Sequence, residues 1–423
     1  MIMCYYNVEV VFMNKKMLII IFLIFVVVRI FLFVIIPHTE IRLNGKKFIT
    51  LEYGEEYEEK GASLLSCNMF NCNLISKSVT ISEILVDKLG TYEISYECEN
   101  NGMNYHNKRY VEVIDSVSPE IKLIGKEKIY LKLNGTYREF GAEAVDNYDG
   151  DLTENITIKN TIDTTKANEY SITYSVKDKS NNESKIDRKI IVYDDVRKDV
   201  KDSNDEQVVA LIDEIDSYIK NNHLSISVLY RDIINGYTYT YNPNKVYYGC
   251  SLIKTLDAMY VYENMQITDY LRNNVEKAIE VSDNDAHYRL VNAIGKSKLA
   301  QYGKELGAKY TLTTGDYYGN TTVYDQEAFM KHLFQLLNTL SNADDLYTFF
   351  SSNFKKYMNF EGAPNILHKF GRISGRYFHD SAIILDDNPY ILSILTQEDD
   401  KKYIITELSK KFYKLNHLLN DAN

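Results

Sequence analysis

The sequence predicts a chain of several domains: an apolar N-terminal helix, two small β-sandwiches, and a C-terminal domain of mixed α and β structure with an antiparallel sheet. A chain of 423 residues is too long for one hydrophobic core. Residues 40–43 match residues 120–123, and further matches share this register, so the chain contains an internal repeat. From residue 206 onward, helical periodicity lies between strand-like stretches at 223–241 and 381–397. The sheet would therefore take strands from both ends of its domain.

Domain boundaries follow from these patterns. We predict a cytoplasmic tail with a transmembrane anchor over residues 1–37 and two β-sandwiches over residues 38–116 and 117–195. A linker over residues 196–205 and the mixed domain over residues 206–423 follow. The linker prediction rests on a charged, Asp- and Lys-rich stretch that lacks apolar periodicity.

Residues 17–36 are almost wholly apolar, and about 20 such residues can cross a bilayer as a helix. Arg29 interrupts the run, at a cost of about 3 kcal/mol near the bilayer centre. Lys15 and Lys16 precede it and the next basic residue is Arg42, so the positive-inside rule predicts a cytoplasmic N-terminus. We expect a single-pass cell-membrane protein whose bulk is extracellular. A cleavable signal peptide is the alternative, but no small-x-small site follows the run.

Composition limits the partners and cofactors. A net charge of −11 at pH 7 argues against nucleic acid. The five cysteines lack metal-ligand spacing, although Cys67 and Cys72 are close enough to bridge. Asp146, Asp149 and Asp151 could be read as calcium ligands, but their spacing fits no known loop, so an ordinary acidic turn is favoured. We expect a monomer without metal or organic cofactor.

Both repeats read as short strands of alternating polarity. Residues 170–176 alternate with period two, and Gly, Asn and Asp clusters separate such runs, which is typical of small β-sandwiches. Residues 137–151 and 174–182 of the second copy resemble bacterial Ig-like surface domains, which occur in tandem on exported proteins. The resemblance implies a spacer or adhesion role for this part of the chain.

Three short motifs stand in order in the C-terminal domain. Ser251 and Lys254 lie three residues apart where a loop becomes a predicted helix, so their side chains share one face. A Ser-Asp-Asn turn at 282–284 separates two predicted helices. Lys369 and Gly371 form K-x-G ahead of a strand-like segment. Each motif alone is common, as a helix cap or a turn. All three in this order are improbable by chance.

These are the motifs of penicillin-recognising serine enzymes. Residues 206–415 resemble the class A β-lactamase domain, and more broadly the superfamily of serine β-lactamases and D,D-peptidases. Residues 247–254 resemble the approach to the nucleophile, and residues 378–384 with 390–396 resemble the paired terminal strands. The resemblance implies a serine hydrolase or acyltransferase that forms an acyl-enzyme with a β-lactam or a D-Ala-D-Ala-type peptidoglycan stem peptide.

The resemblance also implies roles for individual residues. Ser251 would be the acylated nucleophile, and Lys254 would take its proton. Ser282 would relay a proton to the leaving nitrogen, and Lys369 would steady Ser282 and attract the substrate carboxylate. Asn284 would hold the substrate amide. The backbone N–H groups of Ser251 and Arg372 would form an oxyanion hole, worth about 3 kcal/mol per donor.

Two departures from the family pattern change the expected activity. Phe370 stands where the family has Thr or Ser, so a hydroxyl that binds the substrate carboxylate is missing, and Arg372 or Arg376 could substitute. The segment 311–320, which matches the loop that carries a deacylating glutamate, contains no Glu and only Asp316 as an acid. We therefore expect slow deacylation.

Two other classes of function stay open. The C-terminal domain could be a non-hydrolytic module that binds β-lactams or peptidoglycan, or residues 38–195 could act in adhesion. Three histidines lie near the motifs, but a lone histidine is more often structural than catalytic, and we assign no role to His287, His368 or His379.

Overall fold

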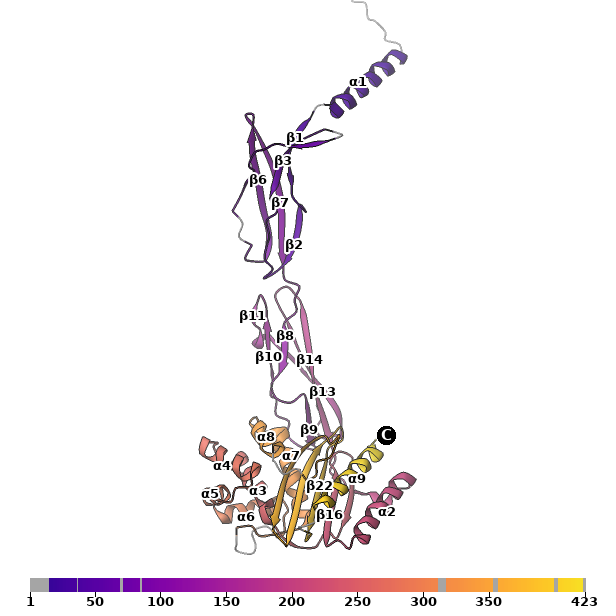
Figure 1. The fold of residues 1–423 in the computed structure, drawn as a ribbon, viewed down its shortest axis with the longest axis vertical. Coiled ribbons are helices and arrows are strands. Elements are labelled where there is room, and N and C mark those ends of the chain that lie inside the picture. Colours follow the sequence, from indigo (N-terminus) through magenta and orange to yellow (C-terminus); the bar gives the residue numbers. More distant parts are fainter. Residues whose placement is uncertain are drawn as a thin grey trace, which may run out of the picture. The chain divides into compact units, whose positions relative to one another are not determined.

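The computed structural model describes most of the chain (Figure 1), namely residues 15–35, 37–68, 71–83, 86–310, 317–352, 357–398 and 402–420. Contacts between residues divide it into two compact units. The first comprises residues 1–120, 144–155 and 177–184, and the second comprises residues 121–143, 156–176 and 185–423.

Helix α1 spans Lys15–Ile35 and is apolar apart from its first two lysines and Arg29. Among the described residues, no helix has the length and apolar character that a membrane crossing requires. The transmembrane helix predicted over residues 17–36 is therefore not supported.

The first β-sandwich packs a sheet of three strands against a sheet of four. The sheets have the orders β1-β3-β4 and β2-β7-β6-β5. Their strands are β1 His38–Leu43, β2 Phe48–Glu52, β3 Ala62–Cys67, β4 Cys72–Leu74, β5 Thr80–Ile81, β6 Gly90–Asn100 and β7 Met103–Ile114. Alternate residues of β6 and β7 are buried, among them Ile94, Tyr96 and Val111. A disulfide joins Cys67 to Cys72, which the sequence showed only to be close enough to bridge.

The second β-sandwich repeats this arrangement, with sheet orders β11-β10-β8 and β12-β13-β14-β9. Its elements are β8 Glu120–Leu123, β9 Lys128–Lys132, β10 Ala142–Asp146, β11 Gly150–Asp151, η1 Thr153–Asn155, β12 Thr157–Asn160, β13 Asn168–Lys177 and β14 Glu183–Tyr193. An ion pair of a buried arginine with a partly exposed glutamate recurs in both copies: Arg109 with Glu59 at 2.7 Å, and Arg188 with Glu139 at 3.2 Å. The repeat seen in the sequence thus extends to a polar group in the core.

The C-terminal domain is built on a six-stranded sheet of order β15-β17-β16-β22-β21-β20. Its strands are β15 Lys198–Asp199, β16 Ile226–Asp232, β17 Tyr237–Tyr241, β20 Asn365–Ile373, β21 Tyr377–Leu385 and β22 Tyr390–Thr396. They come from both ends of the domain, as predicted. The sheet is mixed rather than antiparallel, because β15 pairs with β17 in parallel. The predicted linker contains β15 and the 3-10 helix η2, Val200–Asp202. Both elements are too short to produce a recognisable periodicity in the sequence.

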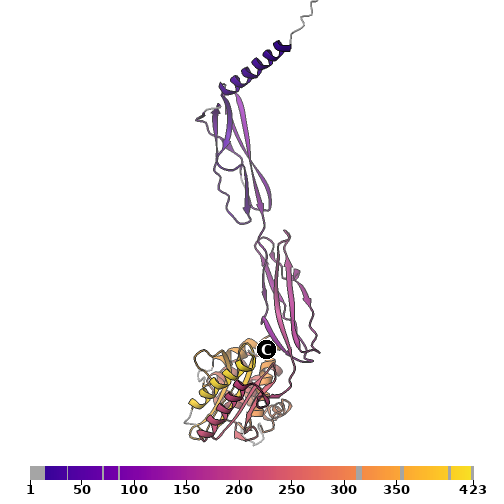
Figure 2. The ribbon, with the colours of Figure 1, turned by 90° about the vertical axis from the view of Figure 1, so that its right-hand side faces the viewer.

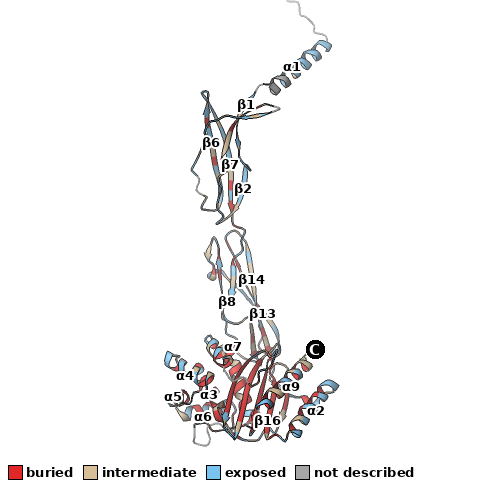
Figure 3. Cartoon of the chain, viewed as in Figure 1, coloured by how far each residue is buried: buried red, intermediate tan, exposed pale blue. Residues whose placement is uncertain are grey.

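Helices cover both faces of this sheet (Figure 1 and Figure 2). α2 Glu206–Asn221 and α9 Tyr403–Asn420 pack on one face, against Val228, Tyr230 and Ile394. The other face, with Leu229 and Leu395, carries six helices: α3 Lys254–Asn264, α4 Asp269–Glu280, α5 Asn284–Ile294, α6 Lys296–Glu305, α7 Val323–Thr339 and α8 Ala343–Ser351. The central strands are buried on both sides (Figure 3). They form a rigid platform whose edge strand β20 carries Lys369.

Candidate active site

Ser251 lies in a tight turn that leads into helix α3. The turn is the 3-10 helix η3, Cys250–Ile253, and α3 begins directly after it at Lys254. The predicted helix start at Ser251 is therefore displaced by one turn. A short two-stranded sheet, β18 Tyr247–Tyr248 with β19 Asn320–Thr321, holds the approach to this turn. Cys250 is buried with φ of 50°, and Ser251 stays partly exposed, so this geometry presents the serine rather than the cysteine.

Lys254 is a fully buried amine at the start of α3. Its Nζ donates to the carbonyl oxygen of Ser282 at 2.6 Å and to Asn284 Oδ1 at 2.8 Å, and it lies 3.4 Å from Ser282 Oγ. Burial lowers its pKa to about 8, against the opposing effect of the Asp257 and Asp283 carboxylates. A share of the amine is thus neutral near physiological pH and able to accept a proton.

Ser282 occupies the sharp turn between α4 and α5. Its φ of 60° lies in the left-handed region, and Asp283 caps α5 by accepting a hydrogen bond from the Ala286 N–H at 2.6 Å. This turn brings the Ser282 hydroxyl between two lysines. Lys369 Nζ, from the buried strand β20, donates to Ser282 Oγ at 3.0 Å. A lysine ammonium can only donate, so the Ser282 hydroxyl accepts hydrogen bonds from Lys254 and Lys369. Its own proton remains available for donation to another group.

Strand β20 passes very close to the turn that carries Ser251. A Cβ atom on Gly371 would lie 2.9 Å from Cys250 Cβ and 3.2 Å from the Ser251 nitrogen, so only glycine fits without displacement. Arg372 comes next, and its side chain is exposed. The strand therefore places the backbone after Lys369 alongside the backbone of the predicted nucleophile.

The structure brings together four of the six predicted site residues by hydrogen bonds, namely Lys254, Ser282, Asn284 and Lys369. Ser251 lies one helical turn from Lys254, but its hydroxyl makes no hydrogen bond within the described part of the chain. The sequence analysis assigned Lys254 to Ser251 and Lys369 to Ser282. In the structure both lysines lie at Ser282. Lys254 donates hydrogen bonds to the Ser282 carbonyl oxygen and to Asn284 Oδ1, and Lys369 donates to Ser282 Oγ.

Two family models match parts of the chain. Residues 268–415 match the model of the "Beta-lactamase enzyme family", and residues 41–113 and 121–192 match the "Bacterial surface protein, Ig-like domain". The chain carries a β-lactamase-like domain that follows two Ig-like domains. No curated protein matches the chain.

Solved structures similar to the β-lactamase-like domain include class A β-lactamases. A variant of the last common ancestor of the Gram-negative enzymes is 19% identical over 50% of this chain and 100% of that one, with a TM-score of 0.43. TLA-1 extended-spectrum β-lactamase is 17% identical over 49% and 98%, also at 0.43. A mutant of PBP-A, in an acyl-enzyme complex with penicillin G, is 16% identical over 50% and 97%, at 0.42.

A buried Asp–His pair joins helices α3 and α5 close to the motif residues, and the sequence analysis missed it. His287 Nδ1 is hydrogen-bonded to Asp257 Oδ2, with both side chains fully buried, and His287 Nε2 lies 3.3 Å from the Tyr317 carbonyl oxygen. Burial raises the pKa of Asp257, and His287 opposes this effect. Asp257 stands three residues after Lys254 on the same helix, a spacing that could have indicated an acid beside Lys254 but not its pairing with His287.

The other two histidines near the motifs also have buried partners. His368 Nδ1 is hydrogen-bonded to Asp380 Oδ1 at 2.9 Å across β20 and β21. His379 contacts the Tyr248 carbonyl at 3.1 Å through Nε2 and accepts from the Thr396 N–H through Nδ1, which fixes its tautomer. Burial lowers the pKa of His379 to about 4, so this ring is neutral. His379 thus links Tyr248, which precedes the Ser251 turn, to strand β22 of the central sheet.

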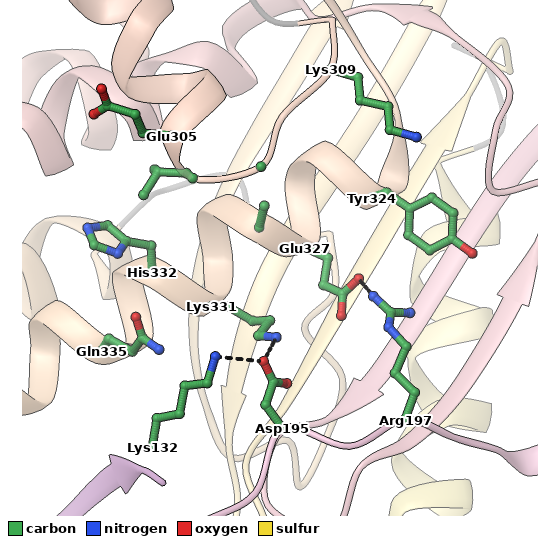
Figure 4. A pocket seen from close by; sticks show the side chains of 13 residues that line it. Lys132, Asp195, Arg197, Glu305, Lys309, Tyr324, Glu327, Lys331, His332 and Gln335 are labelled. Atoms are coloured by element: carbon green, nitrogen blue, oxygen red, sulfur yellow. Dashed lines mark hydrogen bonds and ion pairs between the residues drawn. The ribbon is translucent and has the colours of Figure 1, made fainter. Parts of the chain in front are cut away.

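Asp316, the only acid in the predicted deacylation segment, lies outside the described residues, as does all of 311–316. A separate cavity of about 510 Å³ lies elsewhere and has charged walls (Figure 4). Its three acids are already engaged: Asp195 pairs with Lys132 and Lys331, Glu327 pairs with Arg197, and Glu305 accepts a hydrogen bond from the Gln301 amide at 2.9 Å. None of the predicted site residues lines this cavity, so we do not place the chemistry there.

Proposed function

We propose that the β-lactamase-like domain is an active-site-serine hydrolase or acyltransferase, acylated at Ser251 by β-lactams or by D-Ala-D-Ala-type cell-wall peptides. The observation that carries this proposal is the meeting of two buried lysines at the Ser282 hydroxyl, beside the turn that presents Ser251. Burying a cation costs free energy, and Lys254 forms no ion pair with a described carboxylate. A catalytic role therefore explains these two buried lysines better than a contribution to folding stability does.

In the proposed acylation, neutral Lys254 takes the proton of Ser251 Oγ while this oxygen bonds to the substrate carbonyl carbon. The C–N bond then breaks, and Ser282 passes its proton to the leaving nitrogen and regains one from Lys254. Lys369 holds Ser282 and attracts the substrate carboxylate. The N–H groups of Ser251 and Arg372 receive the oxyanion. Lys254 must turn from the Ser282 carbonyl toward Ser251, as catalytic hydrogen bonds often tighten only with substrate bound.

We propose that the acyl-enzyme persists. Hydrolysis of the ester needs a base that activates water, and the segment that matches the deacylation loop contains no glutamate. The domain would then turn over slowly, pass its acyl group to an amine, or act as an acylated sensor. The binding of substrate carboxylate would rest on Lys369 with Arg372 or Arg376, since Phe370 has no hydroxyl.

A fluorescent penicillin tests acylation. We expect covalent labelling of the full chain, loss of the label in Ser251→Ala, and retention of the label in Ser374→Ala, an exposed serine in the β20–β21 turn. Failure to label at high probe concentration would favour the non-hydrolytic binding module. Nitrocefin hydrolysis at a steady rate above about one per second, a common enzyme range, would contradict the slow deacylation.

A further inference from the structure

Three buried carboxylates gather far along the chain from the β-lactamase-like motifs. Asp115 follows β7, Asp146 ends β10, and Asp178 follows β13. They are only 7%, 4% and 6% exposed. One oxygen from each lies within 4.8 Å of the other two. All three residues belong to the first compact unit.

The negative charge of this cluster is not compensated by the described protein. Both carboxylate oxygens of Asp115 and Oδ2 of Asp146 are buried, and no described group forms a hydrogen bond of full geometry with them. The Ser180 hydroxyl and the Val117 N–H lie near enough to Asp115 to lower its pKa, but neither carries a charge. Nor does any described basic side chain form an ion pair with the three acids. Burial raises the pKa of Asp115, and the like charges of Asp146 and Asp178 raise it further. Buried carboxylates in this state require a counter-charge.

The surrounding hydrogen bonds hold the carboxylates in place without using the free oxygens. Asp146 Oδ1 accepts from the Tyr148 and Asp149 N–H groups at 2.9 and 2.8 Å, which leaves Oδ2 available. Asp178 accepts from the backbone N–H and the side-chain amide of Asn182, each at 2.7 Å. The same amide donates to the Asp115 carbonyl oxygen at 3.1 Å. The three segments are therefore linked before any ligand binds.

We propose that Asp115, Asp146 and Asp178 form a Ca²⁺ site. Ca²⁺ prefers oxygen ligands at about 2.3–2.6 Å, so two ligands of one ion lie at most about 5 Å apart, a limit that this cluster meets. Mg²⁺ needs shorter bonds of about 2.0–2.1 Å, hence a tighter cluster, and Zn²⁺ prefers nitrogen and sulfur. A bound Ca²⁺ would supply the missing counter-charge and join the segment between β7 and β8 to two loops of the second Ig-like domain.

The internal repeat shows that this site is particular to one copy. At the offset of 80, Asp146 aligns with Ser66, and at the offset of 78 set by Tyr92 and Tyr170, Asp178 aligns with Asn100. The first copy therefore lacks two of the three carboxylates. An Ig-like fold of this type does not need the acids for its own stability.

The structure gives different surroundings to the three acids of the turn considered in the sequence analysis. Asp146 joins the buried cluster, whereas Asp149 pairs with Lys179 at 2.8 Å and Asp151 is exposed and accepts from the Thr153 N–H. The expectation of an ordinary turn therefore left out Asp146. Its two partners come from 31 residues before it and 32 residues after it, a pattern that no short motif reveals.

The test uses the full chain, freed of metal with EDTA, with Tb³⁺ and Ca²⁺ as probes. The chain has 36 tyrosines and no tryptophan, and Tyr148 belongs to the Asp146 turn, so excited tyrosine should sensitise Tb³⁺ luminescence. We expect a saturable signal that Ca²⁺ displaces at concentrations where Mg²⁺ does not. We also expect Ca²⁺ to raise the Tm of the Ig-like part of the chain. Absence of a saturable signal, or equal displacement by Mg²⁺, would overturn the assignment.

Isosteric variants make the test specific. Asp115→Asn and Asp178→Asn should each weaken binding at least tenfold, whereas Asp151→Asn, the exposed acid of the same turn, should bind like the wild type. In EDTA, Asp115→Asn should be at least as heat-stable as the wild type because a repelling charge is gone, which separates loss of the site from loss of folding. Equal weakening by Asp151→Asn, or full binding by Asp115→Asn, would refute the proposal.

Discussion

At the residue scale, Lys254 controls when the proposed acylation can occur. Its pKa is lowered to about 8 by burial, so the neutral amine is the minor form below this pH and the major form above it. Acylation by a penicillin should therefore quicken about tenfold per pH unit below pH 8 and level off above it. Stopped-flow labelling across this range measures the profile. Lys254→Arg, which keeps the charge but cannot act as a base, should be slow throughout, and a rate that falls with rising pH would contradict the role.

Asp257 opposes the effect of burial on the pKa of Lys254. Its carboxylate raises that pKa, so Asp257→Asn should lower it and move the midpoint of the acylation profile to lower pH. Asp285→Asn, an exposed acid in the first turn of α5, should leave the midpoint unchanged. A purely structural role for Asp257 predicts a lower Tm with the midpoint in place, and the two readouts together decide between these roles.

At the scale of elements, the close approach of strand β20 to the turn η3 depends on one glycine, Gly371. Gly371→Ala would push a methyl group against Cys250 and the Ser251 nitrogen, displacing the strand from the nucleophile. We expect acylation to fall on the order of 10²-fold, as for loss of one oxyanion donor. The measurement is the rate of penicillin labelling.

Gly375→Ala is the matched control for that substitution. Gly375 has φ of 73° in the β20–β21 turn, and a Cβ there would meet no atom within 4 Å. This variant should lose roughly 1 kcal/mol of stability through backbone strain and keep its acylation rate. Equal loss of acylation in both variants would show that the effect of Gly371→Ala comes from general destabilisation and not from the close approach.

The same scale shows what the sequence could predict. Period-two alternation gave the sandwich strands, and the order of three motifs gave the β-lactamase-like domain, because both signals lie within short stretches of chain. β15 was missed because two residues carry no periodicity, and its parallel pairing with β17 made the sheet mixed. The Asp257–His287 pair and the Asp115 cluster were missed because their members are far apart in sequence, and local patterns do not tell which loops meet.

At the scale of the whole molecule, the two proposed sites lie in different compact units. One core belongs to each Ig-like repeat, and two others enclose the central sheet of the β-lactamase-like domain. A ligand that binds only the folded form of one part stabilises that part. Calorimetry of the full chain should therefore resolve transitions that respond to different ligands.

Acylation and Ca²⁺ should each move only one of these transitions. Penicillin should shift the transition of the β-lactamase-like domain in the wild type and in Asp115→Asn, but not in Ser251→Ala. Adding Ca²⁺ after EDTA should shift the Ig-like transition in the wild type and in Ser251→Ala, but not in Asp115→Asn. Because each variant removes one response and retains the other, failure of either proposal would be visible without affecting the test of the second. Loss of both responses in a single variant would mean that the parts do not unfold independently.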